Sequence, residues 1–114
     1  MDECLFCRII AGQIPARRVH EDEACIAFED LNPQAPHHIL LIPRKHIANL
    51  NDLTPEDDRV VGGLHRVAAE LATKLGIARN GYRLVTNTGA DGGQTVYHLH
   101  FHLLGGRALG WPPG

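Results

Sequence analysis

The sequence predicts an α+β fold of about five mostly antiparallel strands with one long and one short helix. Apolar residues between Thr54 and Gly76 recur with the 3.6-residue period of an amphipathic helix. The run His37–Pro43 is apolar and includes β-branched residues, which is typical of a central strand. Tyr97–Leu104 alternates histidine with apolar residues, and this two-residue period indicates a further strand.

The composition limits domain number, partners and location. The chain has 114 residues, 44% of them hydrophobic, so residues 1–114 are expected to form a single compact domain. The net charge is -2 without a basic stripe, which argues against nucleic-acid binding. No apolar run has the length of a membrane span. The acidic start Met1-Asp2-Glu3 lacks the features of a signal peptide, so a cytoplasmic location is expected.

The first third of the chain predicts a short helix followed by two strands. Leu5–Ala11 has apolar residues at helical spacing, and Gly12 follows it as a stop signal. The expected strands are Arg17–His20 and Ala24–Glu29, which flank a polar turn. Leu31–Pro36 is predicted to be a loop that leads into the central strand, because its prolines have a restricted φ angle.

The long helix carries start and stop signals of its own. Thr54 suits the cap and Pro55 suits the first helical position, while acidic residues follow in the first turn. Gly76 is placed to end the helix. The apolar stripe consists of Val60, Val61, Leu64, Val67, Ala68, Leu71 and Leu75. We expect this helix to cover a sheet and assign it no chemistry.

The last third predicts a strand over Tyr82–Asn87 and then a glycine-rich loop over Gly89–Thr95. Glycines let backbone N–H groups approach an anion closely. Because the loop directly precedes a row of histidines, we interpret it as a phosphate-binding loop. The tail Gly105–Gly114 is too rich in glycine and proline for a regular element. Its Trp111 is expected to pack on this subunit or on a partner.

Three histidines alternate with apolar residues near the end of the chain. On a strand, His98, His100 and His102 would share one face at a spacing of roughly 6.8 Å. The other face would pack into the core through Tyr97, Leu99, Phe101 and Leu103. Core packing does not explain three imidazoles in a row, whereas an imidazole can act as base, acid, nucleophile or metal ligand.

A Cys-x2-Cys pair, Cys4 and Cys7, lies at the start of the short helix. Two thiolates at this spacing can bind one tetrahedral zinc ion, but a zinc site needs two further ligands. A redox role would need a preceding strand, and no strand precedes Cys4. Taken alone, the pair is as consistent with two incidental thiols as with a metal site.

The histidine row favours chemistry at phosphorus. An imidazole can attack a phosphorus centre, form a phospho-imidazole intermediate and then be displaced by water. His100 has an imidazole on each side and is the natural nucleophile. Serine-hydrolase chemistry is disfavoured, because the chain contains no serine.

The motif His98-x-His100-x-His102 followed by Leu103-Leu104 resembles the signature of the histidine triad (HIT) superfamily. Other stretches resemble its Hint branch of nucleoside phosphoramidate hydrolases: Phe6–Ile10 with Ile14-Pro15, Asp30–Pro36, Gly92–Tyr97 and Trp111–Gly114. The resemblance covers nearly the whole chain. It implies a single HIT domain that dimerises into a ten-stranded sheet. It also implies hydrolysis of purine nucleoside 5'-phosphoramidates through a nucleotidyl-histidine intermediate.

The resemblance also implies roles for individual residues. His100 would be the nucleophile, and the other catalytic histidines would be His98, His102 and His38. Asp30 would accept hydrogen bonds from the ribose hydroxyls, as a carboxylate can. The base pocket would consist of Phe6, Ile9, Ile14 and Leu31, and the residues around the phosphate would be Asn87, Gly93 and Thr95. Trp111 would reach the site of the partner subunit.

Two positions depart from the pattern of many Hint proteins. Thr95 stands where many relatives have serine, and strand parity would place it opposite the histidine face unless the loop twists. The cysteine pair resembles part of a zinc site found in other bacterial relatives. There the site is completed by histidines that match His46 and His98. Cys4, Cys7, His46 and His98 would form a closed structural zinc site, and no catalytic metal is expected.

Three alternatives remain open from the sequence. The chain could hydrolyse dinucleoside polyphosphates. It could be a nucleotide-binding interaction protein whose hydrolysis is incidental. The three histidines could instead form a catalytic metal site.

Overall fold

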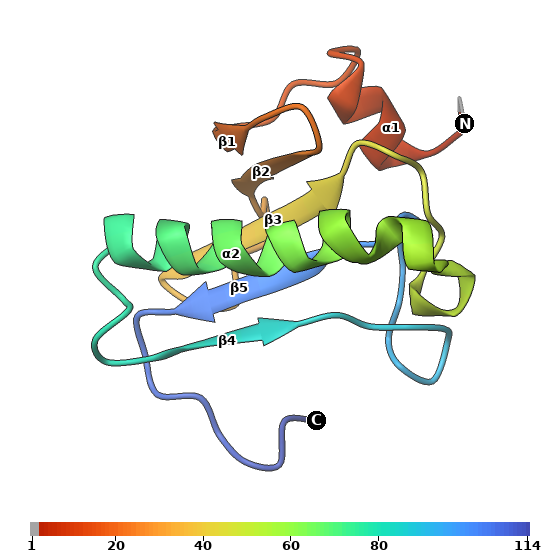
Figure 1. The fold of residues 1–114 in the computed structure, drawn as a ribbon. Coiled ribbons are helices and arrows are strands. Elements are labelled where there is room, and N and C mark those ends of the chain that lie inside the picture. Colours follow the sequence, from red (N-terminus) through yellow and green to blue (C-terminus); the bar gives the residue numbers. More distant parts are fainter. Residues whose placement is uncertain (1–2) are drawn as a thin grey trace.

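The fold is built on one antiparallel sheet. The computed structural model describes residues 3–114, so the Met1-Asp2 part of the N-terminus that we used to argue against a signal peptide lies outside the described residues. Within residues 3–114 the sheet has five strands in the order β1-β2-β3-β5-β4 (Figure 1). The strands are β1 (Arg18–Glu21), β2 (Cys25–Glu29), β3 (His37–Pro43), β4 (Tyr82–Val85) and β5 (Phe101–Gly105). All four strand pairs are antiparallel, which confirms the predicted α+β class.

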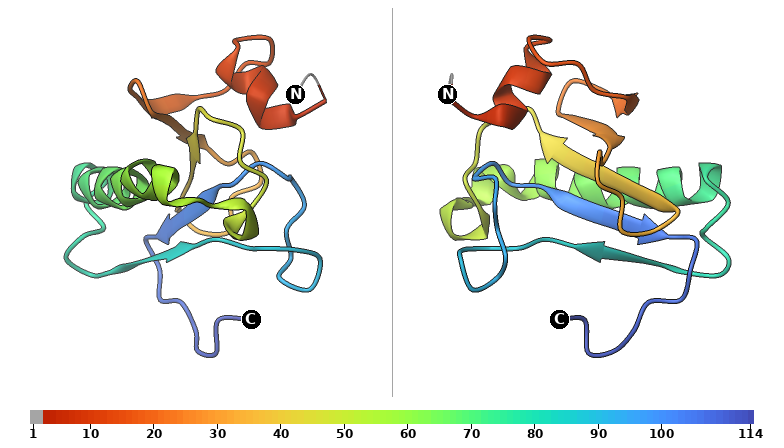
Figure 2. Two further views of the ribbon diagram at one scale, coloured as in Figure 1. Left: turned by 45° about the vertical axis from the view of Figure 1, so that its right-hand side comes forward. Right: turned by 180° about the vertical axis from the view of Figure 1, so that it is seen from behind.

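The two α-helices of the described chain serve different parts of the sheet. The long helix α2 (Asp58–Lys74) lies across one face of β3 and β5, while the short helix α1 (Leu5–Ile10) lies beside the β2–β3 end (Figures 1 and 2). The side chains of β2 and β3 alternate between two apolar clusters, one under α2 and one under α1. β2 and β3 are therefore buried on both faces, and β3 is the central strand that the sequence predicts over His37–Pro43.

The predicted signals at the ends of α2 are confirmed with one refinement. Pro55–Asp57 forms a 3-10 turn, and the α-helix proper begins at Asp58. The Asp57 carboxylate accepts a hydrogen bond of 2.9 Å from the backbone N–H of Thr54. Gly76 ends the helix in the left-handed region with φ 76°. The buried members of the predicted stripe are Leu64, Val67, Ala68 and Leu71.

The histidine-rich strand is shorter than predicted. β5 begins at Phe101, so the expectation of a strand from Tyr97 is wrong for its first four residues. Residues 97–100 do not pair with a neighbouring strand, because long-range hydrogen bonds hold them elsewhere. In one of these bonds Leu99 N donates to Ile47 O at 2.6 Å. Tyr97 is 48% exposed and lies outside the core, contrary to the prediction. Leu99, Phe101 and Leu103 are buried as expected.

Other boundaries differ less. β4 ends at Val85, two residues before the predicted end at Asn87, and the chain then enters the glycine-rich loop. The last residues form a tail beyond β5 without regular structure, which ends on the β4 side of the sheet (Figure 2). No helix among residues 3–114 has the length and apolar character needed to cross a membrane.

Candidate active site

A cavity of about 260 Å³ lies where α1 meets the sheet. Its walls come from α1, the segment 14–16, the end of β2 with the residues that follow it, the middle of β3, and the segment 95–102. Most of the wall is apolar, with Phe6, Ile9 and Phe28 among its members, and Asp30, His100 and His102 supply polar groups. The arrangement suits a ligand with a flat apolar part and a polar part held near imidazoles.

The ring orientation of His100 is set by the main chain. Its Nδ1 lies 2.7 Å from the carbonyl oxygen of His98. Because a carbonyl can only accept, Nδ1 carries the proton, and Nε2 of the neutral ring carries the lone pair. Phe6 packs edge-on against the same ring, with centroids 5.0 Å apart. His100 is 6% exposed and lines the cavity, so a nitrogen nucleophile is held there in a fixed orientation.

His38 and His102 form a hydrogen-bonded pair next to this nucleophile. The backbone N–H of Gln34 donates to His38 Nδ1 at 3.0 Å, so the proton of neutral His38 is on Nε2. This Nε2 lies 2.9 Å from His102 Nδ1 and donates to it. His102 then carries its own proton on Nε2. The chain of donors thus fixes the tautomer of both rings.

Burial keeps this pair uncharged. Desolvation, together with the neighbouring His100 and His38, lowers the pKa of His102 to about 4. Desolvation also lowers the pKa of His38, although the nearby Asp30 carboxylate opposes the shift. Both rings are therefore neutral near pH 7, and His102 holds a transferable proton on Nε2.

Asp30 follows β2 and points one oxygen toward the histidines. Its Oδ1 accepts a 2.8 Å bond from the backbone N–H of Asn32, which fixes the turn. Its Oδ2 lies 3.4 Å from His38 Nε2. Because Asp30 also lines the cavity, its carboxylate can accept hydrogen bonds from a ligand.

The predicted residues divide into those at the cavity and those away from it. Thr95 lines the cavity with His100 and His102, because residues 95–100 do not follow regular strand parity. Leu31 also lines it, although it is 95% exposed. The predicted nucleotide-site residues that do not line it are His38, His98, Asn87, Gly93 and Trp111, and Trp111 is 84% exposed.

The sequence reasoning missed several wall residues. They are Leu5, Pro15, Ala16, Phe28, Glu29, Leu40 and Val96. Phe28 and Leu40 are direct partners across the β2–β3 ladder and point to the α1 side. Period-two alternation could have found them, because Phe28 lies two residues before Asp30 and Leu40 two residues after His38.

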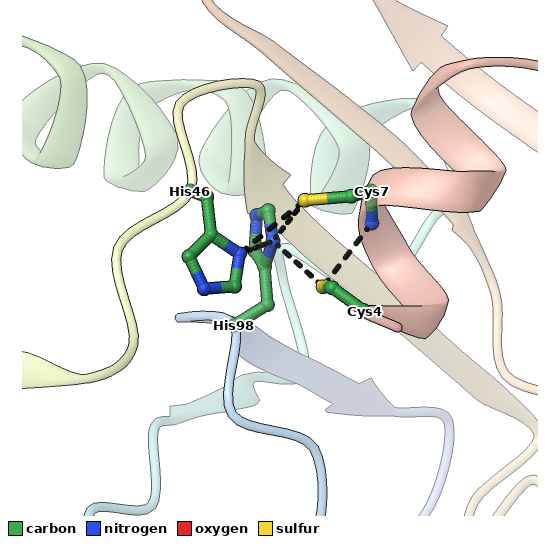
Figure 3. A group of neighbouring side chains, drawn as sticks. All are labelled: Cys4, Cys7, His46 and His98. Atoms are coloured by element: carbon green, nitrogen blue, oxygen red, sulfur yellow. Dashed lines mark hydrogen bonds between the residues drawn. The ribbon is translucent and has the colours of Figure 1, made fainter. Parts of the chain in front are cut away.

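The ring of His98 belongs to a second group of side chains. Cys4, Cys7, His46 and His98 converge from α1, the loop after β3 and the segment before β5 (Figure 3). Cys7 Sγ lies 3.3 Å from His46 Nδ1, and Cys4 Sγ lies 3.4 Å from His98 Nδ1. The two Nδ1 atoms are 3.2 Å apart. Ligand atoms around a tetrahedral zinc ion are separated by about 3.3 to 3.8 Å, so this donor set fits such an ion.

Neighbouring bonds orient this cluster. His98 is fully buried, and its Nε2 donates to the carbonyl oxygen of Pro43 at 2.8 Å. The Nδ1 lone pair is therefore directed to the cluster, as in metal sites whose histidines are braced by a second partner. Burial lowers the pKa of His98 to about 4, which keeps the ring neutral. Burial and the Cys4 thiol raise the pKa of Cys7 to about 11, so a bound metal has to displace thiol protons.

The fold and the site define a protein of the HIT class. The HIT domain family matches residues 11–109 of this chain, and the chain belongs to that family. A HIT-like protein of Synechocystis is 52% identical over 113 residues, which cover 99% of this chain and 98% of the relative. The purine nucleoside phosphoramidase of Escherichia coli K12 is 49% identical over 109 residues, which cover 96% and 92%.

A solved structure supports the same assignment. The crystal structure of a HIT family hydrolase from Legionella pneumophila Philadelphia 1 matches with a TM-score of 0.96 and 51% identity. The match covers 98% of this chain and 100% of the Legionella chain. The resemblance drawn from the sequence motifs is thus confirmed at the level of the family and of its fold.

Proposed function

We propose that this protein hydrolyses purine nucleoside 5'-phosphoramidates, in which a nucleoside monophosphate is linked to an amine. The observation that carries the proposal is the His100 ring, which lines the cavity with its Nδ1 proton bound to the His98 carbonyl oxygen and its Nε2 lone pair unprotonated. The 49% identity to a purine nucleoside phosphoramidase supports the same substrate class.

In the first proposed step His100 Nε2 attacks the α-phosphorus and the P–N bond breaks. In the substrate complex the phosphoryl anion favours uptake of one proton from solvent by the His38–His102 pair. The leaving nitrogen takes the proton on His102 Nε2 in concert with the attack, and the pair returns to its neutral state. The positive charge that forms on the His100 ring offsets the charge lost from the protonated His38–His102 pair, and the ring centroids of His100 and His102 are 5.1 Å apart. The product of this step is a nucleotidyl-imidazole and a free amine.

In the second step water attacks phosphorus and displaces His100. The bond between phosphorus and Nε2 breaks, and the proton of the water passes to His102 Nε2. Both rings then have their starting tautomers, and the nucleoside monophosphate leaves. His38 takes part as the donor that holds His102 Nδ1 at 2.9 Å.

We propose binding roles for the remaining cavity residues. Asp30 accepts bonds from the ribose hydroxyls, and Thr95 places a hydroxyl near the phosphate. The purine lies against Phe6, Ile9, Ile14 and Leu31, with the additional wall residues Phe28 and Leu40. Asn87 and Gly93, which do not line this cavity, stay predicted neighbours of the phosphate, and the exposed Trp111 would act through the predicted homodimer.

The decisive variant is His100→Ala. We expect it to lose hydrolysis of an adenosine phosphoramidate by several orders of magnitude while its circular dichroism and thermal melt are preserved. The matched control is His65→Ala, which removes an exposed histidine on α2. Near-normal turnover by His100→Ala would refute the proposal. A parallel assay with a diadenosine polyphosphate tests the alternative substrate class, since faster cleavage of that substrate would favour it.

We further propose that Cys4, Cys7, His46 and His98 hold a structural zinc ion. The set supplies four ligands and leaves no open position for a substrate, which is typical of structural rather than catalytic zinc. Such an ion would cross-link segments far apart in the sequence. Elemental analysis of protein purified without chelators checks this: we expect about one zinc per chain, and under about a tenth of an equivalent would reject the proposal.

A further inference from the structure

We propose that the Cys4-Cys7-His46-His98 cluster controls the nucleotide site: a metal ion bound there holds α1 closed on the cavity, so that metal-loaded protein binds purine nucleotides more tightly than metal-free protein. The inference rests on the proposed nucleotide-binding function and adds its regulation. It concerns how the chain's own residues transmit metal binding to the cavity.

The helix α1 contributes both to the cavity wall and to the Cys/His cluster, which is the first observation in support of the proposal. This helix has only six residues, Leu5–Ile10, and a helix of that length is marginal without tertiary contacts. Phe6 and Ile9 are 3% and 5% exposed and line the cavity. Cys7 directly follows Phe6, Cys4 lies two residues before it, and both cysteines belong to the cluster. One short element therefore presents a cavity wall and half of a metal site.

The second support is how α1 is attached to the rest of the fold. Its packing is against the apolar cluster of Ile26, Phe28, Leu40 and Ile42. Phe28 and Leu40 also line the cavity, so part of this packing faces the space that a ligand would fill. Arg18 adds a 2.7 Å bond to the Ile9 carbonyl oxygen. The cluster is thus an attachment point of α1 that does not involve the cavity wall.

The third support is the long-range nature of that attachment. Cys7 is 39 positions from His46 and 91 positions from His98. Without a metal, these residues meet through thiol and imidazole contacts of 3.3 and 3.6 Å, which are weak interactions. Metal–ligand bonds would replace them and close large loops at the base of α1.

The fourth support links the cluster to the proposed nucleophile. Phe6 packs edge-on against His98 at 6.0 Å and against His100 at 5.0 Å between ring centroids. His98 also accepts the His100 Nδ1 proton on its carbonyl oxygen at 2.7 Å. A displacement of α1 or His98 would therefore disturb both the base pocket and the ring that faces the phosphate.

The test is a binding measurement that does not depend on catalysis. Wild-type protein is prepared loaded with Zn²⁺ and, separately, stripped by a chelator and then freed of it. Calorimetry with adenosine monophosphate measures the affinity of each form. We expect the loaded form to bind about tenfold more tightly, within the range of roughly 5- to 150-fold typical of coupled sites. By reciprocity the nucleotide should tighten zinc binding by the same factor.

A second readout follows α1 directly. Hydrogen exchange of the α1 amides should be faster in the stripped protein, while the α2 amides exchange at the same rate in both forms. Cys7→Ser should reproduce the stripped behaviour even with Zn²⁺ present. Cys25→Ala is the matched control, because this third cysteine is buried under α2, outside the cluster. It should keep the full response to zinc.

The outcomes separate this inference from the proposed function. Equal nucleotide affinity and equal α1 exchange in loaded and stripped wild-type protein would overturn the inference. Tighter binding by the loaded form without any hydrolysis of a phosphoramidate would support the inference and refute the proposed reaction. No nucleotide binding by either form would overturn both. These comparisons use wild-type protein, so they stand even where Cys7→Ser fails to fold.

Discussion

His100 Nδ1 lies 2.7 Å from the carbonyl oxygen of His98, and this bond joins the two clusters of side chains in the structure. The His98 ring belongs to the Cys/His cluster, whereas the His98 carbonyl oxygen accepts the hydrogen bond from His100, whose ring lines the cavity. The triad is therefore not a row of three equivalent imidazoles. Each of the three has a different bonding partner, and each is expected to respond differently to substitution.

His102→Ala should reduce turnover in a way that depends on the leaving group. Loss of a general acid typically costs 10² to 10⁴ in rate when the leaving group needs a proton. We expect a large loss with alkylamine phosphoramidates and a small one with weakly basic aromatic amines. Measurement of kcat/KM over such a series checks this. His100→Ala should lose activity with every member, and a uniform loss in His102→Ala would contradict the assigned role.

The stability of the protein should fall on acidification from about pH 6.5 to pH 4. Burial lowers the folded-state pKa of His102 to about 4 from the ordinary value of 6.5, so the unfolded chain binds the proton more readily in that window. Protonation of the pair also has to break the bond to Gln34 or the bond between His38 and His102, because both shared nitrogens act as acceptors.

Urea denaturation at several pH values measures this effect. We expect the free energy of unfolding to decrease between about pH 6.5 and pH 4 in the wild type and to decrease less in His102→Gln. His98 and His38 have pKa values shifted in the same direction, so part of the slope should remain. A variant with the full wild-type slope would show that His102 is not a source of the pH dependence.

Asp30→Ala should remove the preference for ribose. Hydrogen bonds to a charged group contribute about 1.5 to 3 kcal/mol, so wild-type protein should prefer a ribonucleotide substrate over its 2',3'-dideoxy form by about that amount. The variant should treat the two substrates alike. The control is Glu23→Ala, which removes an exposed carboxylate of the β1–β2 turn. An unchanged preference in Asp30→Ala would place the ribose elsewhere.

Two glycine-to-alanine substitutions, one in the loop after β4 and one on α2, should change the free energy of unfolding in opposite directions. A Cβ at Gly92 would collide with the backbone oxygen of Thr88, so Gly92→Ala should shift the loop and destabilise the protein. A Cβ at Gly62 on α2 meets no atom within 4 Å. Gly62→Ala should therefore raise the free energy of unfolding by about 0.5 to 1 kcal/mol. Thermal melts of both variants check the opposite signs.

The elements that the sequence predicts well are those determined by local signals. The cap at Thr54 and the glycine at Gly76 bracket the long helix, and the apolar run His37–Pro43 coincides with β3. Local periodicity fails at Tyr97–His100, since bonds to Pro43 and Ile47 from distant sequence hold this segment.

The candidate sites also combine features that local sequence predicts with features that depend on long-range contacts in the fold. The Cys-x2-Cys spacing marks two ligands, but their partners His46 and His98 are brought close only by the fold. The resemblance to relatives predicted those partners, whereas spacing alone did not. For Thr95, the two-residue alternation of a regular strand predicted the wrong face, because this residue lies in an irregular segment and lines the cavity.

Trp111 should report on the predicted homodimer. It is the chain's single tryptophan, and its side chain is 84% exposed when one chain is considered alone. An indole left in water at a tail rich in proline and glycine is costly, so contact with a second chain would stabilise it. We expect light scattering to give the mass of two chains and the fluorescence to show a shielded tryptophan. Dilution should shift the emission to longer wavelength as the dimer dissociates. A monomeric mass together with a water-exposed emission maximum at every concentration would reject the dimer and, with it, the role of Trp111 at the partner's cavity.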